Sequence, residues 1–132
     1  MQFAPYILLL AVMAALTMAA CQNIAHVTQE PVRYYGVQTR LLDNDLEQFH
    51  VTLSGTQSAK QVARYAVYAA AQYTLIRGFG FARQVRTCIG QQADRLSADA
   101  IYTISRSLPQ GTKTIDAEVV ADACARDNIP MV

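Results

Sequence analysis

An uncharged apolar run near the start of the chain is the strongest constraint on its folding, because it limits which residues can form a domain. Residues 6–20 carry no charged side chain. The run is shorter than the roughly 20 apolar residues that a transmembrane helix needs. It ends in small residues, as a secretory signal peptide does before its cleavage site, although no Lys or Arg precedes it. The sequence predicts a cleaved signal peptide over residues 1–20.

The residues at the end of this run favour a particular kind of signal peptide. Met18-Ala19-Ala20-Cys21 resembles the lipobox of bacterial lipoproteins, in which two small residues precede a cysteine that receives the lipid. Two or three acyl chains such as palmitate give stable anchoring, at about 0.8 kcal/mol per buried methylene. We expect Cys21 to be the lipidated first residue of the mature protein. The alternatives are an ordinary signal peptide or a short membrane anchor with an incidental cysteine.

The remaining chain is long enough for one domain, since the whole sequence has 132 residues. Residues 21–33 are predicted to form a lipidated, flexible tether, because the segment after Cys21 is too polar to bury. Residues 34–132 are predicted to form a single domain. The formal net charge of +1 and the lack of a polybasic run argue against a nucleic-acid-binding protein.

Two short patterns around residues 43–45 predict an antiparallel hairpin. Residues 34–42 read as a strand with a bend or bulge at Gly36, and Asp43-Asn44-Asp45 is typical of a turn. Residues 49–54 alternate apolar and polar side chains, which predicts a half-buried strand with Phe49, Val51 and Leu53 facing inward.

Residues 58–77 predict a helix. Ser58 and Gln61 fit a capping box at its start, and Gly78 fits the left-handed position after its end. A stripe of mostly small residues at helical spacing indicates close packing on a sheet; its members are Ala59, Val62, Ala63, Ala66, Ala69, Ala70 and Tyr73.

The second half of the chain predicts two further strands and a short helix. Residues 79–89 read as a strand, with one face formed by Phe81, Arg83, Val85 and Thr87 and the other by Ala82, Gln84 and Arg86. Residues 90–98 read as a polar loop, 100–107 as a strand and 114–126 as a helix. The predicted fold is α+β, a small antiparallel β-sheet with one long helix packed on it and a short C-terminal helix.

The cysteines left after lipidation form an even pair. Cys88 and Cys124 would lie in an oxidising compartment after export, which favours a disulfide. Such a bridge would stabilise the fold by roughly 3–4 kcal/mol in the chain-entropy model. Two buried free thiols and a reactive thiol are the alternatives.

No residue pattern nominates a catalytic or metal site, and no cofactor is expected. His26 and His50 are the two histidines, and neither has a cysteine or carboxylate at ligand spacing. His50 falls on the polar face of a strand, where a surface residue is the common case. Arg64, Tyr65 and Tyr68 form a candidate partner surface, because Tyr and Arg are favoured at interfaces. The alternative for the tyrosines is partly buried rings with solvated hydroxyls.

The sequence also resembles a family of small uncharacterised bacterial lipoproteins across residues 35–120. Their pattern is a V-x-F-x-G-N strand, a Y-x-L-x-R-A-A-E-x-T-L-x-x-G-Y helix and a closing Y-D-A-x-E-V. The corresponding segments here are 49–55, 65–79 and 114–119. Thr56 replaces the usual Asn and Gln72 the usual Glu. The resemblance implies an envelope location and a helix-on-sheet domain, with no implied activity.

These observations favour a membrane-anchored, non-enzymatic binding or structural module of the bacterial envelope. Its partners would be the membrane, through the lipid on Cys21, and an unknown envelope protein or polymer. Gln22 is not the Asp that marks inner-membrane retention in many bacteria, which favours the outer membrane, with the domain on the periplasmic face. The alternatives are a stress or redox sensor that uses a Cys88–Cys124 disulfide and a small envelope hydrolase, which would need a cleft of convergent polar groups around His50.

Overall fold

The computed structural model describes residues 31–56 and 58–130. The predicted signal peptide, Cys21 and the first ten residues of the predicted tether lie outside the described residues. Among the helices that are described, none is both long enough and apolar enough to cross a membrane.

The described part of the chain opens with the predicted hairpin. Strands β1 (Arg33–Asp43) and β2 (Leu46–Ser54) are antiparallel and are joined by a turn in which the Asn44 N–H donates to the Asp43 carboxylate. Gly36 has a φ of 86°, and the pairing shifts register between Tyr34 and Val37, so the predicted bulge is confirmed. A second shift lies between Leu41 and Asp43.

Helix α2 (Ala59–Ile76) begins and ends where the sequence predicts. The Ser58 hydroxyl accepts the Gln61 N–H, while the Gln61 side chain accepts from the Thr56 hydroxyl instead of closing a capping box. Gly78, with a φ of 79°, follows the helix, and the Gly78 and Phe79 N–H groups donate to the carbonyls of Leu75 and Thr74. With 18 residues, α2 is an ordinary helix and not the long one that we expected.

Strands β3 (Phe81–Gln92) and β4 (Arg95–Ser105) form a second hairpin. The predicted loop over residues 90–98 is wrong, because only Ala93 and Asp94 separate the strands. Leu96 and Ala98 continue the inward alternation of β4, and the polar side chains around them face solvent. A register shift between Gln84 and Arg86 marks a bulge in β3.

The closing segment divides into a strand and a helix. Strand β5 (Thr114–Asp116) pairs with the start of β3, and helix α3 (Ala117–Arg126) begins only after it. The Asp116 carboxylate accepts the N–H groups of Glu118 and Val119, which fixes the start of α3. The predicted short C-terminal helix is confirmed, although its first three predicted residues are the strand β5.

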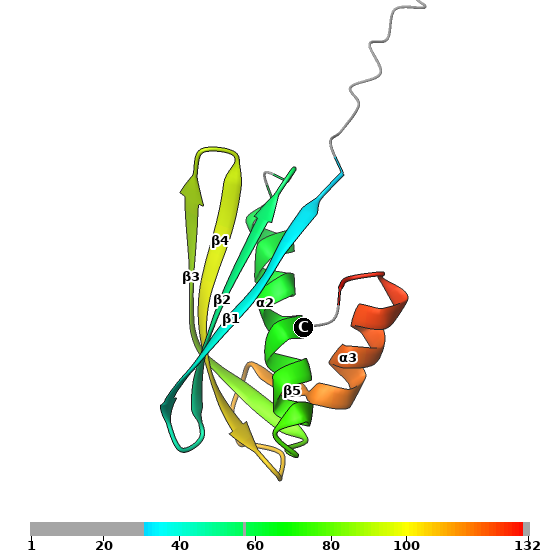
Figure 1. Cartoon of the computed structure of the whole chain (residues 1–132). Helices are drawn as coiled ribbons and strands as arrows, with labels where there is room; N and C mark the ends of the chain where they lie inside the picture. Colours follow the sequence, from blue (N-terminus) through cyan, green and yellow to red (C-terminus); the bar gives the residue numbers. More distant parts are fainter. Residues whose placement is uncertain (1–30, 57, 131–132) are drawn as a thin grey trace, which may run out of the picture.

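The five strands form one antiparallel sheet in the order β1-β2-β4-β3-β5. Figure 1 shows α2 lying across one face of this sheet and α3 beside α2, on the side away from the strands. The mixed α+β class and the antiparallel sheet are therefore confirmed. The core lies between α2 and the sheet and is formed by Phe49, Val51, Leu53, Val62, Tyr65, Ala66, Ala69, Ala70, Ala82, Leu96, Ala98, Ala100, Tyr102 and Ile104.

Candidate functional site

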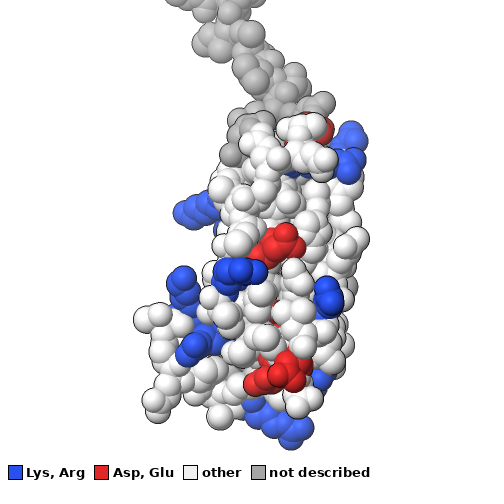
Figure 2. All heavy atoms as spheres, turned by 90° about the vertical axis from the view of Figure 1, so that its left-hand side faces the viewer, with Lys and Arg blue, Asp and Glu red and all other residues white. Residues whose placement is uncertain are grey.

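Within residues 31–56 and 58–130, no helix covers the second face of the sheet, which gathers mostly polar side chains from four strands. We call this the open face; its residues are Gln38, Arg40, Gln48, His50, Thr52, Arg86, Cys88, Ser97, Asp99 and Ile101, as the strand register and alternation place them. Figure 2 views the molecule from the side of the sheet, where acidic and basic groups are scattered and most of the surface carries neither.

An imidazole–carboxylate pair lies at the centre of the open face. His50 and Asp99 are cross-strand partners on β2 and β4, and His50 Nδ1 lies 2.8 Å from Asp99 Oδ1. The other ring nitrogen, Nε2, is 3.4 Å from the Thr52 hydroxyl. The two side chains remain 38% and 48% exposed. The pair thus fixes the imidazole orientation while leaving both groups accessible to a ligand.

A shallow cavity of about 380 Å³ adjoins this pair on the open face. Besides His50 and Asp99, it is lined by Gln38, Thr39, Arg40 and Gln48. Within the described part of the chain, the side chains of Gln38, Arg40 and Gln48 have no hydrogen-bonding partner. The cavity therefore presents two amides and a guanidinium that are free to bind a ligand. We call it the open-face cavity.

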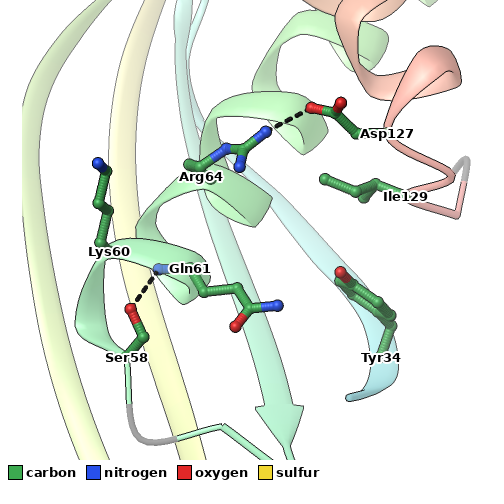
Figure 3. Close-up of a pocket in the computed structure, with 7 residues that line it drawn as sticks. All are labelled: Tyr34, Ser58, Lys60, Gln61, Arg64, Asp127 and Ile129. Atoms are coloured by element: carbon green, nitrogen blue, oxygen red, sulfur yellow. Dashed lines mark hydrogen bonds and ion pairs between the residues drawn. The ribbon is translucent and has the colours of Figure 1, made fainter. Parts of the chain in front are cut away.

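A second cavity, of about 340 Å³, lies between α2, the start of β1 and the end of α3. In Figure 3, Arg64 reaches from α2 to Asp127, which follows α3. The Tyr68 hydroxyl accepts from Arg64 and donates to Asp127, 3.1 Å away. The guanidinium that lines this cavity is therefore already used to hold the two helices together.

The burial of the tyrosines contradicts the predicted partner surface at Arg64, Tyr65 and Tyr68. Tyr65 is only 2% exposed and packs edge to face against Tyr34, with ring centroids 4.8 Å apart. Tyr68 is 7% exposed, because α3 and its C-terminal residues cover that side of α2. The rings are buried more completely than the alternative of partly buried rings with solvated hydroxyls predicts, since the Tyr68 hydroxyl is bonded to Arg64 and Asp127. Arg64 remains at the surface.

The predicted Cys88–Cys124 disulfide is wrong, because both thiols are free and lie on opposite sides of the sheet. The bulge at Val85 reverses the alternation of β3, so Cys88 pairs with Asp99 and faces outward. Cys124 lies on α3 and is buried where that helix packs against α2. Its thiol lies 3.4 Å from the Ile129 carbonyl. Burial raises the pKa of the Cys124 thiol, which disfavours its reactive thiolate form.

A buried carboxylate was missed by sequence reasoning. Glu47 precedes Phe49, Val51 and Leu53 on the inward face of β2 and is completely buried. One of its oxygens accepts from Arg77 Nη1 at 2.6 Å, while the other, Oε2, has no partner among the described residues. Burial raises the pKa of Glu47, although Arg77 acts in the opposite direction. Extending the inward–outward alternation of β2 by one step before Phe49 would have predicted that Glu47 faces inward.

We expect Glu47→Gln to change how stability depends on pH. Because the folded-state pKa is raised, the folded protein binds the Glu47 proton more tightly than the unfolded chain does. The wild-type free energy of unfolding should fall as the pH rises from the ordinary pKa of Glu through the raised one. The neutral variant should lack this fall, so it should gain stability relative to wild type over that interval.

Urea melts at a series of pH values measure this difference. Asp45→Asn is the control: it removes an exposed acid in the neighbouring turn and should keep the fall in stability that Glu47 causes. A stability difference between Glu47→Gln and wild type that stays constant with pH would contradict the assignment.

Fold and site together define an α+β domain in which α2 covers one sheet face, α3 packs beside α2, and a polar cavity lies on the other sheet face. Residues 34–128 match the YNQ4 C-terminal domain family, and since that match covers most of the chain, the protein belongs to this family. No curated protein and no solved structure matches the chain. The resemblance to small bacterial lipoproteins stays a prediction.

Proposed function

We propose that the protein is a lipid-anchored, non-enzymatic binding module of the bacterial envelope that uses its open face. The anchor rests on Met18-Ala19-Ala20-Cys21 and on the polar segment between this motif and the domain. Strand β1 begins at Arg33, so residues 22–32 separate it from Cys21. At about 3.3–3.6 Å per extended residue, these eleven residues would let the domain extend roughly 36–40 Å from a membrane surface.

The observation that carries the binding role is the open-face cavity. Its side chains come from β1, β2 and β4, which are held rigidly by the hydrogen bonds of the sheet. A site built on strands keeps its geometry better than one built on loops. Free amide and guanidinium groups on such a scaffold suit the recognition of a polar partner.

The two alternative functions, a redox sensor and a hydrolase, are supported to different degrees. A redox sensor based on the Cys88–Cys124 pair has lost its basis, since these thiols face opposite sides of the sheet. A hydrolase would need a polar cleft at His50, and the open-face cavity meets that requirement. However, Thr52 is the hydroxyl next to the imidazole, its contact of 3.4 Å is long for a nucleophile and base, and it does not line the cavity. Binding therefore explains the cavity better than hydrolysis.

Gln22 bears on which membrane holds the protein. The residue after the lipidated cysteine is not the Asp associated with inner-membrane retention, so we place the anchor in the outer membrane and the domain in the periplasm.

In-cell photo-cross-linking tests whether the open face is the surface that meets the partner. We expect a cross-linking residue at Cys88, which is exposed on the open face beside Asp99 and does not line the cavity, to form an adduct in the native membrane. The same residue at Val119 should form none, because Val119 is exposed on α3, on the other side of the molecule. Adducts from position 119 alone, or equally from both positions, would reject the open face as the binding surface.

A further inference from the structure

The open-face cavity has a regular layout that follows from strand register. Gln38, His50 and Asp99 form one cross-strand row. Arg40 and Gln48 form part of the next row, two residues along β1 and β2. Strands lie about 4.8 Å apart and alternate residues about 6.7 Å apart. The cavity is therefore a small, fixed grid of hydrogen-bonding groups.

The groups on this grid include both donors and acceptors of hydrogen bonds. Each glutamine amide has an NH₂ donor and a carbonyl acceptor, and Arg40 adds donors only. Asp99 directs Oδ1 at His50, which leaves Oδ2 as an acceptor. A hydroxyl group is likewise both donor and acceptor, so a ligand rich in hydroxyls matches this grid at every position.

Charge and position disfavour other ligand classes. Arg40 and Asp99 balance each other, so the cavity lacks the cationic excess that a phosphate-rich ligand needs. In the described residues no group of three or more His, Cys, Asp or Glu side chains could hold a metal ion. An extended peptide adds to the edge of a sheet, whereas this cavity opens on a face. The cavity between α2 and α3 is a weaker candidate, since Arg64 is already bonded to Asp127 and Tyr68.

We infer that the open-face cavity binds uncharged sugar units of an envelope glycan. The volume of about 380 Å³ is near the lower end of the range for ligand sites, which suits one or two sugar rings. This inference rests on the proposed binding function and names the class of its ligand. His50, oriented by Asp99, and the amides of Gln38 and Gln48 recognise the hydroxyls, while Arg40 borders the cavity at the β1 edge.

Calorimetric titration of the mature lipidated protein in detergent micelles tests the inference. The probe is chitotetraose, an uncharged oligomer of N-acetylglucosamine, and we expect saturable binding. Each lost hydrogen bond weakens binding by about 0.5–1.5 kcal/mol. The double variant Gln38→Ala/Gln48→Ala should therefore bind about 5- to 150-fold more weakly. Gln92→Ala is the matched control, because Gln92 is an exposed glutamine at the far end of β3 and should leave the affinity unchanged.

Two further measurements separate the outcomes. Melting temperatures of all variants should equal that of wild type, because the three glutamines are not buried. Titration with inorganic phosphate should give no heat that depends on Gln38 and Gln48. Absence of chitotetraose binding, equal affinity of the double variant, or phosphate binding at the same glutamines would overturn the sugar site. If such a result is found while the residue at position 88 still cross-links, the binding module stands and only the sugar site is rejected. If position 88 forms no adduct either, both proposals are rejected.

Discussion

Cys21→Ala should release the protein from membranes into the soluble periplasmic fraction. The cysteine thiol is the predicted attachment point of the lipid, and alanine cannot form the thioether. Removing two or three acyl chains removes the burial that anchors the domain, at about 0.8 kcal/mol per methylene. Because this energy is large, we expect release to be almost complete.

Fractionation of cells that express wild type or variant, followed by blotting, measures the effect. Cys88→Ala is the control, since Cys88 lies on the open face, outside the signal, and should keep the protein membrane-bound. If Cys21→Ala remains in the membrane fraction, the chain is not a lipoprotein, and the apolar run itself is its anchor.

Ala70→Leu should destabilise the domain by about 1–3 kcal/mol. Ala70 is completely buried where α2 packs on the sheet, and extra methylenes in a filled core force neighbouring side chains or the backbone to shift. Ala66→Leu should act in the same way. Chemical denaturation followed by circular dichroism gives the change in the free energy of unfolding.

Ala59→Leu is the matched control for the overpacking experiment. The predicted small-residue stripe includes Ala59, but the structure leaves Ala59 exposed in the first turn of the same helix. The identical substitution there should leave stability nearly unchanged. Equal, small effects at positions 59 and 70 would mean that α2 does not approach the sheet as closely as the structure has it.

Local patterns predicted the elements that depend on a few neighbouring residues. The alternation of Phe49, Val51 and Leu53 predicted their burial, and Ser58 and Gly78 predicted the ends of α2. Such local signals predict structure because these residues satisfy backbone hydrogen-bonding groups or fill the core regardless of how the rest of the chain packs. The inward positions of β4 were harder to read, since Ala98 and Ala100 are too small to stand out in a polar stretch.

The candidate site depended on pairings that no local pattern encodes. Asp99 and His50 are 49 residues apart in the sequence. They meet because β4, which follows β3 along the chain, pairs with β2. Likewise, one bulged residue, Val85, decides which face Cys88 occupies, and the docking of α3 decides the burial of Tyr68. These outcomes follow from register and tertiary packing, which a period-two or helical pattern does not specify.

The two register shifts in β1 affect how copies of the protein could associate if they were crowded on a membrane. β1 is a long edge strand, and Tyr35, Leu41 and Leu42 leave apolar surface on it. Copies anchored to one membrane would meet at high effective concentration, where a straight edge invites sheet-to-sheet joining. The irregular pairing at residues 34–37 and 41–43 breaks the straight row of hydrogen-bonding groups near both ends of the strand. Such breaks would hinder neighbouring copies from growing into a continuous sheet and would leave each open face accessible.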